Sequence, residues 1–152
     1  MKKLYRTLPV LFILPLCVSC NEIKNDEQLQ KRLISSTQSG KDVLDLSRLT
    51  DFSWDSMLIL TPYYPVEDAA KALNVDLSPI IRAHSTLRDD LNTLVFIDNG
   101  KAVHMVSCPR SSSDFVLDTL RLIPREQAKF SINQNDPPNT YGTRWVEVKL
   151  IQ

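Results

Sequence analysis

The sequence predicts an α+β fold, in which a small and mostly antiparallel sheet of about five strands is packed by one or two helices. Three segments lead to this prediction. Trp54–Thr61 is an apolar run typical of a buried strand, and Val66–Leu73 has apolar residues at helical spacing. Asn99-Gly100 separates two further apolar runs, and this dipeptide indicates a tight β-hairpin because both turn residues tolerate positive φ.

The chain begins with the pattern of an export signal. A short cationic start precedes the apolar run Leu8–Val18, which is interrupted by Pro9 and Pro15. A membrane-spanning helix needs about 20 apolar residues, so this run is too short to span a bilayer. The prolines also argue against a buried core helix, because each removes a helical hydrogen bond.

Two cysteines compete for the position after the cleavage site. Cleavage before Cys17 would leave Leu16 at the scissile position, whereas cleavage before Cys20 leaves Ser19, a small residue that suits this position. Ser19-Cys20 resembles the lipobox of bacterial lipoproteins, although Cys17 stands where that family usually has Leu. The resemblance implies a diacylglycerol and an acyl chain on Cys20, and hence permanent membrane attachment. By the same resemblance, Asn21 in place of Asp implies the outer membrane, facing the periplasm, in a host that has two membranes.

We therefore divide the chain into a signal peptide at 1–19, a lipidated cysteine with a polar tether at 20–41, and a single α+β domain at 42–152. Within the tether, Leu29 and Leu33 lie one helical turn apart, but two apolar residues make only a thin stripe. The whole chain has 18 basic and 18 acidic residues, and its signal segment is basic. The mature part is thus mildly acidic, which disfavours nucleic acid as a partner.

The domain begins near Val43, and its elements follow from local signals. Pro65 suits the first turn of the predicted helix, Asn74 its end, and Ser78-Pro79 either a short helix or a loop. After the hairpin, the expected elements are a connection at 107–118, a weak strand at 129–132, a loop at 133–142 and a last strand at 144–151. In the second hairpin arm, alternation places Val103 and Met105 on one face and His104, Val106 and Cys108 on the other.

The chain offers little for catalysis. Its histidines, His84 and His104, have no metal-ligand spacing around them, and its isolated glycines form no phosphate-binding loop. His104 and Cys108 share a strand face, but four residues of strand span about 13 Å, too far for a hydrogen-bonded dyad. Cys108 is better explained as a buried structural cysteine. We expect no cofactor and no metal, and a hydrolase that uses His84 or His104 is the least favoured function.

A binding surface is the remaining possibility. Aromatic and arginine residues are enriched at binding hot spots, and the candidate set here is Trp54, Asp55, Tyr63, Tyr64, Arg82 and Arg110. Two simpler explanations compete: Trp54 belongs to the core with a capping Asp, and one of the tyrosines packs under the helix. Phe52-x-Trp54-Asp55, followed by an apolar strand and Pro62-Tyr63, resembles a pattern in small bacterial exported proteins with no assigned activity.

Together, an anchor and a sequence without catalytic motifs predict a non-enzymatic envelope lipoprotein that binds another protein. Its size, mild acidity and location favour an immunity or inhibitor protein that neutralises an incoming toxin or hydrolase. The alternative is a structural accessory of an envelope complex. Resident partners would favour the accessory, and a foreign target would favour the inhibitor.

Overall fold

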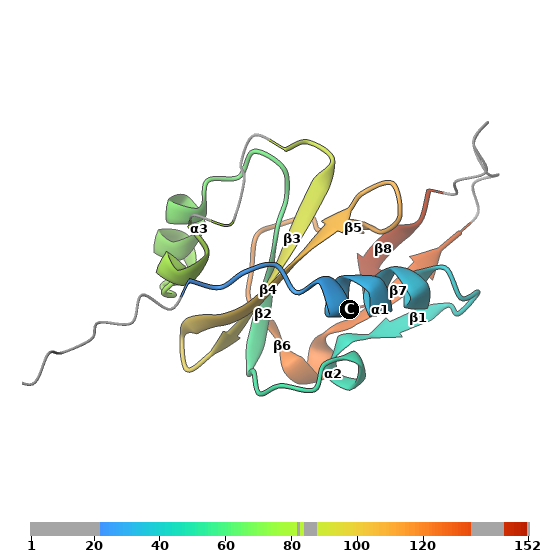
Figure 1. Cartoon of the computed structure of the whole chain (residues 1–152), viewed down its shortest axis with the longest axis horizontal. Helices are drawn as coiled ribbons and strands as arrows, with labels where there is room; N and C mark the ends of the chain where they lie inside the picture. Colours follow the sequence, from blue (N-terminus) through green and yellow to red (C-terminus); the bar gives the residue numbers. More distant parts are fainter. Residues whose placement is uncertain (1–21, 82, 84–87, 135–144, 152) are drawn as a thin grey trace, which may run out of the picture.

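The computed structural model in Figure 1 describes residues 22–81, 83, 88–134 and 145–151. The predicted signal peptide, Cys20 and Arg82 lie outside these residues. The elements in chain order are α1 Glu27–Thr37, β1 Val43–Asp45, α2 Leu46–Leu49, β2 Ser56–Leu60, α3 Val66–Leu73, η1 Ser78–Ile80, β3 Leu91–Asp98, β4 Lys101–Pro109, β5 Asp114–Val116, β6 Ile123–Pro124, η2 Arg125–Gln127, β7 Lys129–Asn133 and β8 Glu147–Leu150.

The α+β class is confirmed, with a richer sheet arrangement than the sequence predicted. Within the described residues, the strands form two four-stranded sheets, sheet A in the order β4-β3-β2-β6 and sheet B in the order β1-β7-β8-β5. All pairings are antiparallel except that of β5 with β8. The strands that the sequence did not reveal, β1, β5 and β6, are two or three residues long. Segments this short show no readable alternation.

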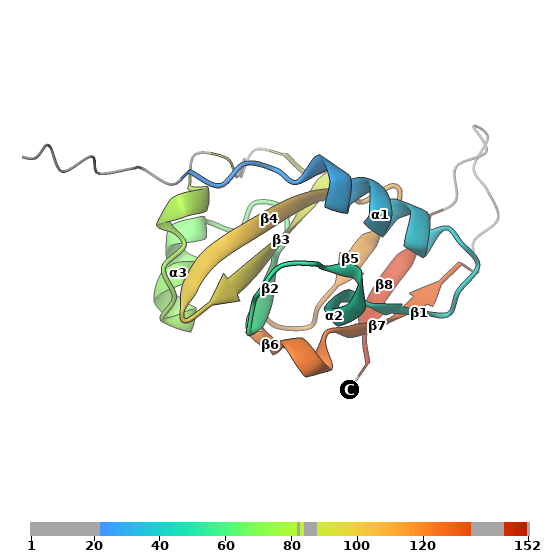
Figure 2. The same cartoon turned by 60° about the horizontal axis from the view of Figure 1, so that its bottom comes forward.

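Sheet A is buried on both faces, and Figure 2 shows it between α3 and sheet B. The helix-facing cluster, on the α3 side, is Leu58, Leu60, Val66, Ala69, Leu77, Ile80, Val95, Ile97, Ala102 and Met105. The sheet-facing cluster, on the other side, is Leu29, Leu33, Leu44, Leu46, Trp54, Met57, Ile59, Leu94, Phe96, Val106, Cys108, Phe115, Ile123, Ala128, Phe130, Ile132, Val146 and Val148. The stretches 57–60 of β2 and 94–97 of β3 are apolar without interruption, because each successive side chain enters one cluster or the other.

Helix α3 forms as the sequence predicts. Val66 and Ala69 are buried in the helix-facing cluster, and Ala70 and Leu73 pack against its rim. Asn74 ends the helix in the left-handed conformation, φ 53° and ψ 50°, which is the usual geometry of a helix C-terminus. Ser78-Pro79 begins the short 3₁₀ helix η1, so the helical alternative at this position is confirmed.

The predicted hairpin joins β3 to β4. Asn99 and Gly100 have φ 50° and 74°, the positive values that a tight two-residue turn requires. One detail of the second arm is corrected. The register pairs Phe96 with His104 but Ile97 with Ala102, so Val103 is an extra, bulged residue. Val103 therefore packs against the sheet-facing cluster instead of sharing a face with Met105.

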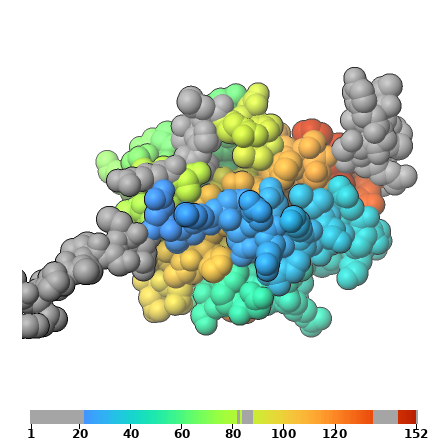
Figure 3. All heavy atoms as spheres, viewed as in Figure 1, coloured from blue at the N-terminus to red at the C-terminus, as the bar shows by residue number. Residues whose placement is uncertain are grey.

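The predicted tether at 20–41 is corrected where it is described. Leu29 and Leu33 are both 0% exposed, and α1 crosses β4 as part of the folded body. Asp26 begins the helix, because its carboxylate accepts hydrogen bonds from the backbone N–H groups of Gln28 and Leu29. The two leucines are enough to hold the helix on the body, because both side chains enter the sheet-facing cluster. Figure 3 shows α1 lying on the surface of the body.

The outer edge of β4 is covered by two chain segments. Asn25 forms a parallel bridge with Met105, and Asp76 forms one with Lys101. The backbone N–H of Ile23 also donates to the carbonyl oxygen of Pro79 at 2.9 Å. Covering an edge in this way removes a site for unwanted strand pairing. It also fixes the path of the chain from Ile23 onward.

Candidate functional site

A hydrogen-bonded polar cluster near the surface is centred on Asp114, the first residue of β5. Its side chain is 9% exposed and accepts from Arg110 Nε at 2.8 Å and Arg110 Nη2 at 3.2 Å. Asn92 Nδ2 donates to the same carboxylate at 3.0 Å. The turn that follows β4 brings Arg110 and Asp114 together, four residues apart. Hydrogen bonding to Asp114 raises the pKa of the Arg110 guanidinium, which stays charged.

Trp145 completes this cluster. The Arg110 guanidinium carbon lies 5.7 Å from the centroid of the Trp145 ring, within cation–π range, and the Trp145 side chain is 43% exposed. The backbone holds the two segments together, because the Asp114 N–H donates to the Val146 carbonyl oxygen at 2.8 Å. We name Arg110 and Trp145 the Arg–Trp surface. It presents a large aromatic side chain on a guanidinium that the protein interior holds in place.

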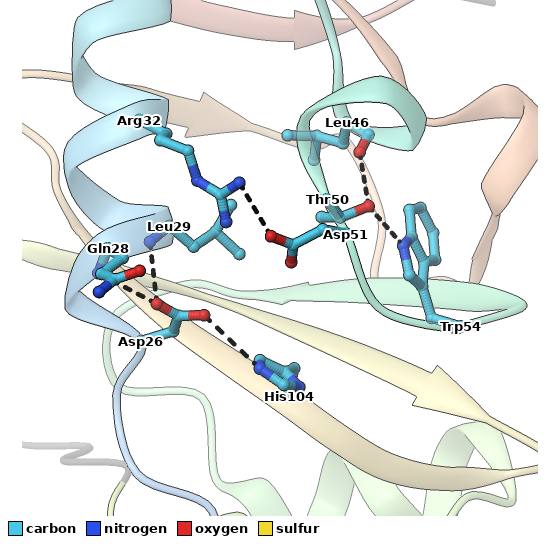
Figure 4. Close-up of polar contacts among 9 residues, drawn as sticks. All are labelled: Asp26, Gln28, Leu29, Arg32, Leu46, Thr50, Asp51, Trp54 and His104. Atoms are coloured by element: carbon cyan, nitrogen blue, oxygen red, sulfur yellow. Dashed lines mark hydrogen bonds and ion pairs between the residues drawn. The ribbon is translucent and has the colours of Figure 1, made fainter.

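Of the six residues predicted to form a binding surface, Trp54 lies in the core instead. It is 3% exposed, and its Nε1 donates to Thr50 Oγ1 at 2.8 Å (Figure 4). The Thr50 hydroxyl donates in turn to the Leu46 carbonyl oxygen at 3.0 Å. Trp54 also meets Phe96 edge to face, with ring centroids 5.1 Å apart. The core explanation therefore applies, and a binding role for Trp54 is wrong.

Asp55 is exposed, but it has a structural task. Its carboxylate accepts from the backbone N–H of Asn99 at 2.7 Å and from the Ser56 hydroxyl at 2.7 Å. These bonds tie the β3–β4 turn to the start of β2. Asp55 lies at the turn end of sheet A, whereas Arg110 follows the opposite end of β4. The structure does not bring these two residues together.

The two tyrosines differ, as the sequence alternatives allowed. Tyr64 is half-buried against the helix-facing cluster, whereas Tyr63 is 63% exposed. The Tyr64 N–H donates to the Thr61 carbonyl oxygen at 3.2 Å, which closes a turn with Tyr63 at φ 64°. This position favours Gly or Asn, so the backbone of Tyr63 is strained.

His104 has a partner that sequence reasoning missed. Its Nε2 lies 3.5 Å from Asp26 Oδ2 (Figure 4). Its ring also stacks on that of Phe52, with centroids 3.8 Å apart and planes at 9°. Because the Asp26 carboxylate also caps α1, this contact joins the start of the helix to β4. Asp26 precedes Glu27 at a position that suits a helix N-cap, and this feature of the sequence could have indicated a helix here instead of a tether. His84 lies outside the described residues.

The prediction that Cys108 is buried is confirmed. The thiol is free and fully enclosed in the sheet-facing cluster, and burial raises its pKa from 9.0 to about 12. A thiol with so high a pKa holds its proton at neutral pH and is a poor nucleophile. Among the described residues, no group of three or more His, Cys, Asp or Glu side chains is placed to hold a metal ion.

Comparisons with known proteins add no relative. No protein-family model matches the chain, and neither the curated proteins nor the solved structures yield a match. Across the part of the chain that the structure describes, no helix has the length and apolarity of a membrane span.

Proposed function

We propose that this chain is a lipid-anchored bacterial envelope protein that binds another protein through the Arg–Trp surface. The observation that carries the binding proposal is the exposed Trp145 ring held over Arg110, which is itself fixed by the buried Asp114 carboxylate. Tryptophan and arginine are the residue types that most often dominate the energy of protein interfaces.

Preorganisation makes this surface a better candidate than Tyr63. Ordering a side chain on binding costs about 0.5–1.5 kcal/mol, and a side chain that is already ordered avoids most of this cost. Arg110 is held by the carboxylate of Asp114, and its Nη1 also donates to the Asp89 carbonyl oxygen at 3.3 Å. Among the described residues, no hydrogen bond or ring contact orders the Tyr63 side chain in the same way, and its exposed position at a turn favours mobility.

The anchor rests on the lipobox resemblance at Cys20, and the kind of partner rests on location and charge. A mildly acidic, membrane-held domain suits an immunity or inhibitor protein that meets an incoming toxin or hydrolase. Assembly with resident envelope proteins is the alternative. For the least favoured hypothesis, a hydrolase that uses His84 or His104, Cys108 offers no ready nucleophile, because burial raises its pKa to about 12.

The test is a crosslinking pull-down from living host cells with the full chain, its Trp145→Ala variant and a matched Ile151→Ala control. Ile151 is 44% exposed, close to the 43% of Trp145, and it follows β8 at the other end of that strand. We expect a partner that the wild type and Ile151→Ala capture and that Trp145→Ala loses. All three chains should keep the same melting temperature.

Two outcomes contradict this proposal. Capture of the same partners by Trp145→Ala would exclude the Arg–Trp surface. An unlipidated protein, as shown by the mass of the purified chain, would exclude the anchor at Cys20. A partner that is a resident envelope protein would favour assembly, and a partner found only after a toxin is supplied would favour inhibition.

A further inference from the structure

The distance from the proposed lipid to the folded body is very short. Cys20 precedes Ile23 by three residues, and each extended residue spans at most about 3.6 Å, so Cys20 reaches no further than about 11 Å from Ile23. The chain is fixed at Ile23, whose N–H donates to the Pro79 carbonyl oxygen at 2.9 Å. A polar tether would have separated the domain from the bilayer, but α1 is part of the body.

Residues 22–26, which precede α1 and which we name the leading segment, are attached to the body at further points beyond Ile23. The Ser107 N–H donates to Asn25 Oδ1 at 2.7 Å, and the Asp26 N–H donates to the Met105 carbonyl oxygen at 3.1 Å. Together with the bridge between Asn25 and Met105, these bonds hold the segment along the edge of β4. The anchor therefore leaves the body from a fixed place beside η1.

From this constraint we infer that the η1 end of the domain lies against the membrane surface. This inference rests on the proposed lipidation of Cys20. The residue that follows η1, Ile81, is 41% exposed and presents an apolar side chain at this end of the domain. Ile23 and Val75 are half-buried nearby, on the rim of the helix-facing cluster. An exposed isoleucine within reach of a lipid anchor would insert among the headgroups and bury its apolar area there.

Among the described residues around this end of the domain, charge does not favour the contact. The exposed charged side chains of the leading segment and α3 are of both signs: Glu22, Lys24, Glu67, Asp68 and Lys71. Attraction to anionic lipids requires a cluster of cations, which these residues do not form. The anchor supplies the affinity, and the apolar contact sets the orientation. In Figure 1, β8, which follows Trp145, lies in the half of the molecule away from α3 and the leading segment. The Arg–Trp surface thus stays accessible.

The experiment uses the lipidated full chain in vesicles of phosphatidylethanolamine and phosphatidylglycerol. An environment-sensitive fluorophore is placed at Ile81→Cys or, as control, at Val43→Cys, which is 48% exposed on sheet B. The buried Cys108 stays unlabelled, and the parent chain checks this. We expect headgroup-attached spin labels to quench the Ile81 probe and iodide to lose access to it. The Val43 probe should behave as it does in the soluble Cys20→Ser form.

A second variant separates orientation from anchoring. Inserting about ten Gly and Ser residues between Asn21 and Glu22 adds about 17 Å of reach. This chain should still float with vesicles, while the Ile81 probe becomes less protected. Flotation with a fully iodide-accessible Ile81 in the parent spacing would overturn this inference and leave the anchor intact. Failure to acquire lipid, measured by mass, would overturn the proposed anchor and this inference together.

Discussion

The two faces of sheet A are built in opposite ways. The helix-facing cluster draws its residues from one continuous stretch of chain, Leu58 to Met105, and one short helix with η1 covers it. The sheet-facing cluster draws on residues from Leu29 to Val148 and needs sheet B, α1 and α2 to close it. The first face is therefore a local structure, and the second depends on contacts between segments far apart in sequence. Their energetics should differ accordingly.

The largest test compares two leucines in helices on the two faces. We expect Leu29→Ala to lower the free energy of unfolding by about 2–5 kcal/mol, because Leu29 is fully buried and its loss leaves a cavity. Leu73→Ala, on the half-buried rim of α3, should cost about 1 kcal/mol. Urea denaturation of both variants measures the difference. Equal costs would mean that α1 contributes no more than the rim, as the tether interpretation required.

Alkaline pH should weaken the sheet-facing cluster through Cys108. Below pH 9.0 the thiol is protonated in both the folded and the unfolded chain, so it adds no pH dependence. Between pH 9.0 and about 12 the unfolded chain releases this proton while the folded chain keeps it. The free energy of unfolding therefore falls with rising pH, by up to about 1.4 kcal/mol per unit.

The control for this effect is Cys108→Ala, whose unfolding should lack this part of the alkaline slope. Both proteins contain the same tyrosines and lysines, so the difference between their slopes reports Cys108 alone. Parallel slopes from pH 8 to about 11 would show that the thiol is accessible to water in the folded protein.

A smaller effect is expected where the leading segment joins the body. Asp26→Ala removes the side-chain cap of α1 and the contact with His104, and we expect a loss of about 1 kcal/mol. Asp26→Asn keeps a capping oxygen and should recover most of this loss. Thermal unfolding followed by circular dichroism compares the two. A full loss in Asp26→Asn would assign the stability to the contact with His104 and not to the cap.

The smallest effect is expected at Tyr63, in the turn beside the helix-facing cluster, where a substitution should increase the free energy of unfolding. Tyr63→Asn should raise the free energy of unfolding by about 0.5–1 kcal/mol, because Asn tolerates the φ of 64° better than Tyr does. Asn74→Ala is the matched control. It places a less suitable residue at φ 53° and should lower stability by a similar amount. A loss of stability in Tyr63→Asn would mean that the exposed tyrosine contributes packing that outweighs the backbone strain.

The same difference between local and long-range contacts explains why only part of the candidate site can be predicted from the sequence. The residue type of Arg110 predicts a binding role, but the sequence pattern places Trp145 only within the expected last strand at 144–151. Nothing in the sequence indicates that the turn after β4 meets the residue before Val146. That meeting depends on the parallel pairing of β5 with β8, two segments about thirty residues apart in sequence, whose loop closure leaves no local pattern.

The local features can be predicted from the sequence: the Asn99-Gly100 hairpin, the amphipathic helix α3 ending at Asn74, and the burial of Cys108. In each case the controlling interactions lie within a few residues or follow directly from side-chain polarity. Contacts between distant segments, by contrast, make α1 part of the core, leave Val103 bulged and place Trp145 over Arg110. These outcomes depend on how segments far apart in sequence pack against one another. Such packing leaves no periodic pattern in the sequence of either segment.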